Sequence, residues 1–281
     1  MRVSVIIPNH NYAKFLPETV SSVLNQTYQD LEIIVVDNGS TDNSLEILKK
    51  YPNVQVISQL DLGQAMARHV GVLHSSGDVI AFLDADDFWH PEKITEQMKL
   101  IFKGHSLVLC SIQYVAKNGE FLRSFSYGND RMDFAQLPFT RPGISIIEAG
   151  ESSVILTKAL YYAVGGFDLT LTSSSGWDLF RRCAKKEIFG IVNRELVYYR
   201  QHDENLSKNT KKMNQEFLLC YRKVLSEMEK SFFLGLLLAA RVDIIYFKSL
   251  LLGKASFREY FTSIPRLSIL YQLSLGCKKL L

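Results

Sequence analysis

The chain has 281 residues, of which 47% are hydrophobic, so it can bury a large core and is not an intrinsically disordered protein. Its net charge of +3 is distributed unevenly, because residues 230–281 carry eight Lys and Arg against two acidic residues and the rest of the chain is therefore acidic. This distribution disfavours a main domain that binds nucleic acid.

The cysteines lie far apart without a Cys-x-x-Cys pair, which argues against a structural zinc site and against a disulfide framework. They are Cys110, Cys183, Cys220 and Cys277. A strand-like run at Arg2–Pro8 has no charged and apolar leader before it, so we expect no signal peptide. Both observations favour a cytoplasmic protein with reduced cysteines.

Strand and helix patterns alternate through the first hundred residues. Short apolar runs predict strands, and amphipathic stretches between them predict helices. The expected strands are residues 3–7, 31–36, 54–58 and 79–83, and the expected helices begin near Pro17, Ser44 and Gly63. This alternation is typical of an α/β fold with an open, mostly parallel sheet flanked by helices.

The fourth predicted strand runs directly into three carboxylates, Asp84, Asp86 and Asp87. Carboxylates this close repel one another and lose solvation near a strand end, so a hard divalent cation such as Mg²⁺ or Mn²⁺ is their natural partner. The alternative is a solvated acidic turn, in which Asp87 or His90 precedes Pro91 at the start of the next helix.

Asp37 also follows a predicted strand, so Asp37 and Asp84 can meet at the carboxyl edge of the sheet, where open α/β folds bind ligands. The alternative for Asp37 is a simple turn residue. No Gly-x-Gly-x-x-Gly follows the first strand and no Gly-Lys-Ser/Thr loop occurs, which disfavours dinucleotide dehydrogenases and P-loop proteins. A phosphate would then be bound through a metal ion and Arg68, which projects from the third predicted helix.

Four segments form a set of motifs in a fixed order. They are SVIIPNHN from Ser4, IVVDNGSTD from Ile34, GQAMARHVG from Gly63 and FLDADD from Phe82. Together they resemble the successive signatures of family 2 glycosyltransferases with the GT-A fold. The resemblance spans roughly the first hundred residues, and a later GGFD turn that ends at Asp168 matches it again.

The resemblance implies a role for each matched position. The loop after the first strand and Asp37 would hold the nucleotide base, Arg68 would lie near the diphosphate, and Asp84 and Asp86 would form an Asp-x-Asp pair. The residues assigned to the nucleotide sugar are Pro8, Asn9, Asn11, Asp37, Arg68 and Asp84. Asp86 would bind the divalent metal, Mn²⁺ or Mg²⁺, with help from Asp84. The chemistry agrees, because a metal ion stabilises the charge that develops on a departing nucleoside diphosphate.

The chain departs from the family at the expected catalytic base. Relatives often carry Glu-Asp before Trp-Asp, and a carboxylate there deprotonates the acceptor hydroxyl, whereas this chain has Ser175-Gly176. Asp178 is therefore our first candidate for the base and Asp168 the second. The alternative for Asp178 is an acidic residue that favours the first turn of a helix.

His202 lies in the polar segment Tyr198–Ser207, which is similar to the end of the catalytic domain in many relatives. It could complete the metal shell or contact the diphosphate, because neutral imidazole binds Mn²⁺. The alternative is a solvated loop histidine.

The C-terminal segment is apolar and basic. Arg241, Asp243 and Lys248 interrupt every apolar window long enough to span a membrane, so a spanning helix is disfavoured. Arg241 and Lys248 share a helical face, which is typical of a helix on the inner surface of a membrane. The alternative is a helix packed on the catalytic domain or on a second subunit of a homo-oligomer.

The resemblance implies an inverting, metal-dependent enzyme that moves a sugar from a nucleotide diphosphate sugar, usually UDP-linked, to a hydroxyl acceptor. We expect a glycan or lipid-linked acceptor, in cell-surface polysaccharide or glycan synthesis. The expected domains are a catalytic domain at 1–210, with a nucleotide-sugar half at 1–115 and an acceptor half at 116–210, and a helical tail at 211–281. A second hypothesis is a nucleotide-sugar-binding module that has lost its base. A nucleotidyltransferase is disfavoured, because no Gly-rich basic loop follows the first strand.

Overall fold

The computed structural model describes residues 1–127, 150–172 and 174–203, together with five isolated positions from 205 to 223. The chain divides into two compact units, Met1–Ala135 with Ser145–Asp203 and Gln136–Ile144 with Glu204–Leu281. The description below concerns the first unit. The predicted C-terminal helix on a membrane and residues 128–149 of the predicted acceptor half lie outside the described residues, and the domain boundaries stay predictions.

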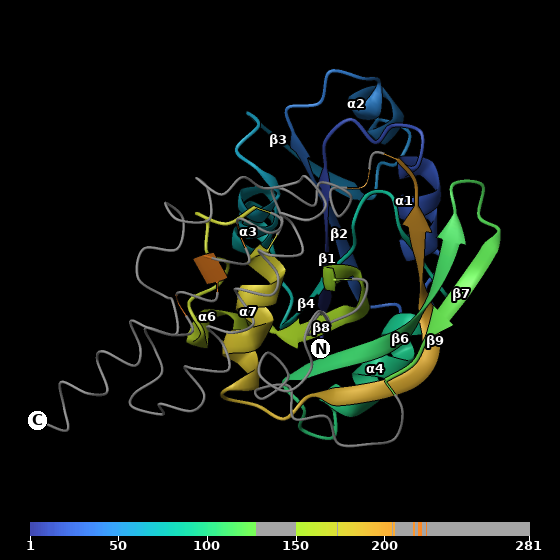
Figure 1. The fold of residues 1–281 in the computed structure, drawn as a ribbon. Coiled ribbons are helices and arrows are strands. Elements are labelled where there is room, and N and C mark those ends of the chain that lie inside the picture. Colours follow the sequence, from blue (N-terminus) through green and yellow to red (C-terminus); the bar gives the residue numbers. More distant parts are fainter. Residues whose placement is uncertain are drawn as a thin grey trace, which may run out of the picture. The chain divides into compact units, whose positions relative to one another are not determined.

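Within the described residues, nine strands form one sheet in the order β3-β2-β1-β4-β8-β6-β9-β5, and β7 pairs with β6 (Figure 1). The strands are β1 Val3–Asn9, β2 Leu31–Asn38, β3 Val54–Gln59, β4 Val79–Phe82, β5 Phe88–Trp89, β6 Leu107–Ala116, β7 Phe121–Phe125, β8 Val154–Thr157 and β9 Gly190–Gln201. The sheet therefore contains every strand that the alternating pattern predicts. It also contains β5 to β9, which lie outside that pattern.

The two halves of the sheet differ in strand direction. Strands β1 to β4 pair only in parallel with one another, as expected for strands joined by helical crossovers. Beyond β4 the sheet is mixed, because β8 is antiparallel to both β4 and β6, whereas β6 and β9 are parallel. The expected open α/β sheet is confirmed, and the change of direction at β8 separates the first half from the second.

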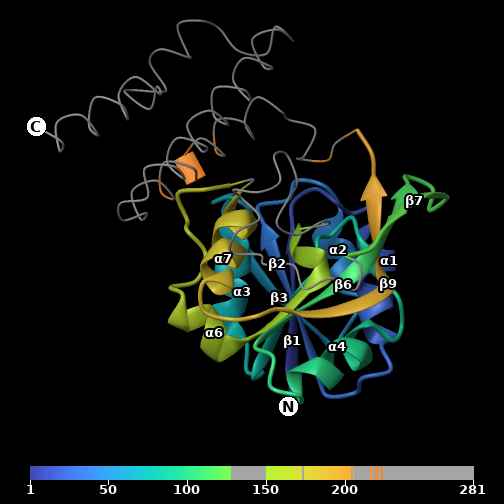
Figure 2. The same cartoon turned by 60° about the horizontal axis from the view of Figure 1, so that its bottom comes forward.

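Helices cover both faces of the sheet. They are α1 Leu16–Leu24, α2 Ser44–Leu48, α3 Gln64–His74, α4 Lys93–Ile101, α6 Lys158–Ala163 and α7 Ser175–Ala184, with a short 3₁₀ turn η1 at Gly150–Ser153. Figures 1 and 2 show α3, α6 and α7 on one side of the sheet and α1, α2 and α4 on the other.

Alternate residues of the strands fill the two cores. Val5 and Ile7 face the cluster that contains α1 and α4, whereas Ile6 lies under α3. A Cβ atom on Gly71 of α3 would lie 3.2 Å from Cγ1 of Ile6 and still closer to Cγ2, so glycine lets this helix pack directly on β1. Burial of both faces explains why these strands read as continuous apolar runs.

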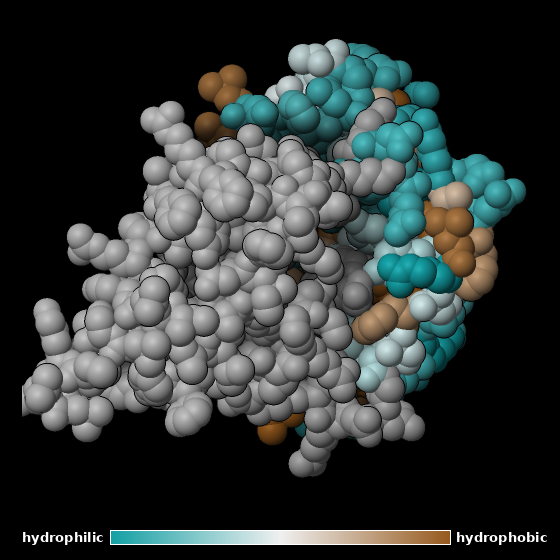
Figure 3. Space-filling view, viewed as in Figure 1, coloured by the Kyte–Doolittle hydropathy of each residue, from teal (hydrophilic) through white to brown (hydrophobic). Residues whose placement is uncertain are grey.

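The surface of the described residues is mostly hydrophilic in the view of Figure 3. Among the described helices, none is long and apolar enough to cross a membrane.

Candidate active site

The register of the sheet brings the ends of three strands to one edge. Asn9 of β1 pairs with Asp37 of β2, and Ile6 pairs with Phe82, the last residue of β4. The chain therefore leaves β4 for Asp84 at the edge where β1 and β2 end. This is the edge at which the alternating sequence pattern places a ligand site.

Asn9, Asp37 and Ser40 form one hydrogen-bonded group. Asn9 Nδ2 donates to Asp37 Oδ1 at 2.8 Å and to Ser40 Oγ at 3.1 Å, and the Ser40 backbone N–H donates to Asp37 Oδ2 at 3.2 Å. Asp37 is 2% exposed. Among the described residues Asn9 Oδ1 is buried without a hydrogen-bond partner, so this group keeps one unused acceptor.

Asn11 fixes the loop beside this group. Its φ is 61°, a left-handed conformation that asparagine tolerates. Its Oδ1 accepts from the backbone N–H groups of Thr41 at 2.7 Å and of Asp42 at 3.2 Å. Pro8 lies in β1 opposite Val36, so it belongs to the framework below the loop.

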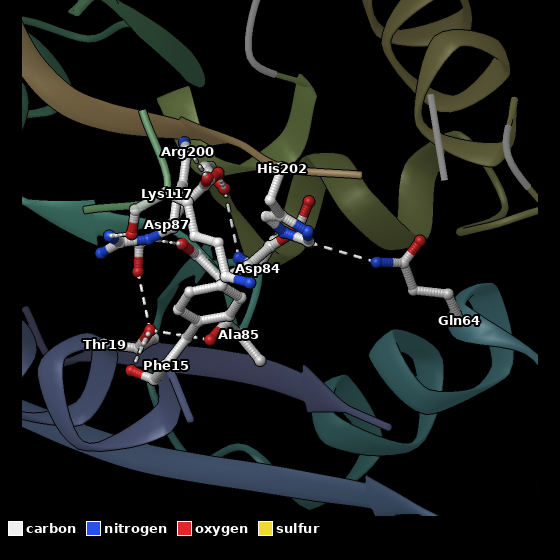
Figure 4. Close-up of polar contacts among 11 residues, drawn as sticks. Phe15, Thr19, Gln64, Asp84, Ala85, Asp87, Lys117, Arg200 and His202 are labelled. Atoms are coloured by element: carbon white, nitrogen blue, oxygen red, sulfur yellow. Dashed lines mark hydrogen bonds and ion pairs between the residues drawn. The ribbon is translucent and has the colours of Figure 1, made fainter. Parts of the chain in front are cut away.

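Arg68 is the cation at the centre of the edge. Its guanidinium contacts Asp84 Oδ1 at 2.5 Å and Glu151 Oε1 at 2.8 Å, and the residue is 1% exposed. Gln64, one turn earlier on α3, donates to the same Asp84 oxygen at 3.4 Å (Figure 4). A buried arginine between two carboxylates is held in place by both.

Asp86 and His202 lie in contact although they are 116 positions apart in the sequence. His202 Nε2 lies 2.9 Å from Asp86 Oδ2, and the imidazole is 1% exposed, packed 4.9 Å from the ring of Phe15 and 5.8 Å from that of Tyr12. His202 is therefore a buried residue of the site, and the alternative of a solvated loop histidine is wrong.

Asp87 braces the turn between β4 and β5. Its Oδ2 accepts from Ser152 Oγ at 2.7 Å and its Oδ1 from the backbone N–H of Arg200 at 3.0 Å. Thr19 of α1 donates to the Asp87 carbonyl at 2.8 Å, and Arg200 donates to the Lys117 carbonyl at 2.8 Å (Figure 4). Asp87 is thus committed to holding the loop that carries Asp84 and Asp86.

The carboxylates of this edge are not fully neutralised. Burial raises the pKa of Asp84 to about 6, with Glu151 and Asp86 adding to the effect and Arg68 opposing it. Burial, followed by the charges of Asp86 and Asp84, also raises the pKa of Asp87 well above its usual range. A cation bound here would relieve this repulsion.

The side chains present fit a hard divalent ion. Asp84 and Asp86 supply the oxygen ligands that Mg²⁺ and Mn²⁺ prefer, and His202 supplies an imidazole. No group of three or more such side chains is arranged around a common centre within the described residues. Mg²⁺ sites commonly take one or two carboxylates from the protein and the remaining ligands from substrate phosphates and water.

Asp178 and Asp168 lie in other surroundings. Asp178 of α7 is 2% exposed, and its two oxygens accept from Arg181 Nη2 at 3.1 Å and Arg182 Nε at 2.9 Å. Asp168 Oδ1 accepts from Thr170 Oγ1 at 2.6 Å within its own turn. As described, each is engaged in local pairing, and their assignment as base stays a prediction.

The sequence analysis did not find several residues of the site. Glu151 and Ser152 follow the irregular segment with no motif of their own, and Gln64 and Ser40 lie inside motifs without an assigned role. Arg200 lies in the segment Tyr198–Ser207, in which the sequence analysis assigned a role only to His202. No local sequence signal marks Glu151, and only the packing of its carboxylate against Gly176 in three dimensions shows its place in the site.

Comparisons with known proteins agree with this arrangement. The sequence profile described as glycosyl transferase family 2 matches residues 4–161. An uncharacterized glycosyltransferase of Nostoc sp. is 44% identical over 99 residues, which are 34% of this chain and 31% of that protein. Chondroitin synthase of Pasteurella multocida is 27% identical over 73% of this chain and 21% of its own length. The match covers about a third of the length of the Nostoc protein and of two Rickettsia glycosyltransferases.

Two solved structures share the fold. TarS of S. aureus, in complex with UDP-GlcNAc, superposes with a TM-score of 0.72 at 18% identity, over 98% of this chain and 88% of that one. A mannosyltransferase of Pyrobaculum calidifontis, in complex with GDP-Man and Mn²⁺, gives 0.63 at 15% identity, over 99% and 87%. At these identities the likeness shows the fold, which is that of GT-A glycosyltransferases. Because the profile matches more than half of the residues, the chain belongs to glycosyltransferase family 2.

Proposed function

We propose that this glycosyltransferase moves a sugar from a nucleotide diphosphate donor, UDP-linked, to a hydroxyl acceptor with inversion at the anomeric carbon. One observation carries the proposal. The polar group around Asn9 and Asp37 and the charged group around Arg68, Asp84 and Asp86 lie at one edge of the sheet, so a nucleotide base and its diphosphate have complementary partners.

The Asn9 group is suited to a nucleobase. A carboxylate only accepts hydrogen bonds, so the amide nitrogen of Asn9 must face Asp37 and its oxygen must face away. That oxygen is the buried acceptor without a partner in the described part of the chain. An N–H of a nucleobase would satisfy it, and leaving it unpaired costs about 1–3 kcal/mol.

The charged group is suited to a diphosphate. Asp84 and Asp86, with His202 beside them, would hold a divalent cation, which when bound neutralises charge on the leaving nucleoside diphosphate. Arg68 would add a second positive charge, fixed by its contacts with Asp84 and Glu151. The Mn²⁺ present with GDP-Man in the archaeal mannosyltransferase structure supports a metal of this kind.

The names of the relatives support a donor class and a setting. TarS is solved with UDP-GlcNAc, and a chondroitin synthase is among the related sequences. We therefore favour a UDP-sugar donor, a glycan or lipid-linked acceptor, and a role in polysaccharide or glycan synthesis.

A screen of UDP- and GDP-sugars tests the proposal. With 1 mM Mn²⁺, the cognate donor should raise Tm by several degrees, since a ligand at 100 times its Kd stabilises the folded state by about 2.7 kcal/mol. EDTA should abolish that shift, and the protein should release nucleoside diphosphate from the same donor. A chain that shows no shift with any of these donors would contradict the proposal.

The absent acidic pair at Ser175 and Gly176 keeps a second candidate function open. A nucleotide-sugar-binding module without a base would show the Mn²⁺-dependent rise in Tm but no release of nucleoside diphosphate. Measuring both quantities on one preparation separates the two functions.

The C-terminal segment adds a proposal about location. We propose that residues 231–281 contact an anionic membrane surface through an apolar face and basic residues. The full chain should sediment with vesicles that contain acidic lipid and should be released by 1 M salt, because screening shortens the reach of these charges. Equal sedimentation with neutral vesicles, or none with either, would contradict it.

A further inference from the structure

We propose that Glu151 is the catalytic base of this enzyme and supplies from η1 the carboxylate that α7 lacks at position 176. The proposal rests on the proposed sugar transfer. It adds a catalytic residue that lies outside every motif of the sequence.

The first observation is the packing of Glu151 against Gly176. A Cβ atom on Gly176 would lie 2.5 Å from the Cδ atom of Glu151 and still closer to Oε1, so the carboxylate occupies the space where any side chain of residue 176 would begin. Gly176 lies in the first turn of α7. A carboxylate from another element thus stands at the position where the sequence pattern led us to expect an acidic side chain.

The second observation is that Glu151 belongs to the charged edge. Its Oε1 contacts Arg68 Nη1 at 2.8 Å, and the same guanidinium contacts Asp84. Its negative charge contributes to the raised pKa of Asp84. The Glu151 carboxylate is therefore directed towards the side chains that would bind the donor diphosphate.

The third observation is that the other acids of the edge have assigned partners. Asp87 accepts from Ser152 and from the Arg200 backbone, and Asp86 contacts His202. Glu151 uses Oε1 for Arg68, whereas no partner for Oε2 is found within the described part of the chain. The side chain is 12% exposed, so it is ordered by its surroundings and still reaches the surface.

These observations define the proton transfer. The acceptor hydroxyl oxygen bonds to the anomeric carbon while its O–H bond breaks, and the proton passes to Oε2 of Glu151. The bond between the anomeric carbon and the phosphate oxygen breaks, and its electron pair leaves with the nucleoside diphosphate. Glu151 then returns the proton to water. A positioned carboxylate typically contributes about 10²- to 10⁴-fold to such a step.

The experiment uses the full chain with Mn²⁺ and the UDP-sugar, UDP-GlcNAc first, that the donor screen identifies. Glu151→Gln keeps the size of the side chain and a hydrogen bond to Arg68 but cannot take a proton. We expect donor affinity within about threefold of the wild type and a kcat lowered at least about a hundredfold. Glu46→Gln, an exposed acid on α2, is the matched control and should leave both quantities unchanged.

A relocation of the carboxylate separates a base from a residue that only positions Arg68. Gly176→Asp alone should disturb the site, because its side chain would collide with Glu151. Combined with Glu151→Ala, the same aspartate enters vacated space, and we expect kcat to rise at least about tenfold over Glu151→Ala alone. A positioning role predicts no such recovery and predicts a change in KM for the donor in Glu151→Gln.

An active wild type whose Glu151→Gln variant retains kcat within tenfold would overturn the assignment of Glu151 and leave the proposed function standing. A wild type that neither binds nor turns over any of the nucleotide sugars would overturn both the assignment of Glu151 and the proposed function. Melting temperatures of all variants, measured without donor, identify any loss that comes from unfolding.

Discussion

Two groups of buried carboxylates in this chain differ in their charge balance. At the edge of the sheet, Asp84 and Glu151 share one buried guanidinium, that of Arg68, and Asp86 contacts His202. In α7, Asp178 alone has two guanidiniums within 3.1 Å. None of these carboxylate side chains is more than 21% exposed, so exposure alone does not explain the difference between the groups.

The balance of charge shows which group is prepared for a ligand. Burial raises the pKa of Asp84 to about 6, the charges of Glu151 and Asp86 add to the effect, and a bound cation would favour the ionised carboxylate. Asp178 already accepts from two arginines of α7, and one of them, Arg182, also donates through Nη2 to the Gly166 carbonyl at 2.6 Å. We infer that the first group binds a ligand and the second stabilises the fold.

The substitution Asp86→Ala should have the largest effect among the tests of this comparison. Removal of one ligand should lower Mn²⁺-dependent donor affinity roughly a hundredfold or more, because a metal supplies several kcal/mol at such sites and each 1.4 kcal/mol is tenfold. The free protein should lose little stability, since the substitution also removes a repelling charge. Titration calorimetry with the donor, with and without EDTA, measures the first effect and urea unfolding the second. Unchanged donor affinity that ignores EDTA would contradict the metal assignment.

Asp178→Asn tests the other group. The substitution removes the charge that pairs with Arg181 and Arg182, and breaking a buried pair in this way costs about 3 kcal/mol. Folded variant protein should keep kcat within about tenfold of the wild type. A kcat at least a hundredfold lower in protein that remains folded would instead support the assignment of Asp178 as base that the sequence motif implies.

The difference between the carboxylates at the sheet edge and Asp178 in α7 also shows how far the sequence could predict the site. Asp37 and Asp84 follow apolar strands, and parallel strands bring their carboxyl ends to one edge, so local pattern alone predicts that these residues lie close together. His202 was identified through a motif, although its contact with Asp86 spans 116 positions. Local patterns carry no information about a contact of that kind.

Glu151 and Asp178 show the limit more clearly. The motif transfers a role to Asp178 by position, but the side chain turns to arginines three and four residues along its own helix. Glu151 reaches Arg68 from a segment without regular periodicity, and only tertiary packing shows that it fills the space beside Gly176. Strand β9 and its parallel pairing with β6 were missed for the same reason.

Lys93 of α4 is a buried cation with no carboxylate partner among the residues that the structure describes. It is 0% exposed, its Nζ donates to Gln97 Oε1 at 2.7 Å, and it lies 4.0 Å from the centre of the Trp89 ring. Burial lowers the pKa of Lys93 to about 8, with a small opposing effect from Cys110. An unbalanced charge here therefore weakens the fold at neutral pH.

The pH dependence of this cost gives the smallest predicted effect. Between pH 8 and pH 10.5 the unfolded chain keeps the Lys93 proton and the folded chain releases it, so the stability contributed by this residue rises with pH in that window. Lys93→Met cannot titrate, and Cys110 is present in both proteins, so the difference between their free energies of unfolding isolates Lys93. Relative to the variant, the wild type should gain about 1 kcal/mol per pH unit, with about 1.4 as the upper limit.

Urea unfolding at intervals from pH 7.5 to pH 9.5 measures this difference. Loss of the hydrogen bond to Gln97 lowers the free energy of unfolding of the variant by the same amount at every pH and does not change its dependence on pH. Parallel plots of the free energy of unfolding against pH for the two proteins would therefore show that Lys93 keeps its ordinary pKa in the folded chain.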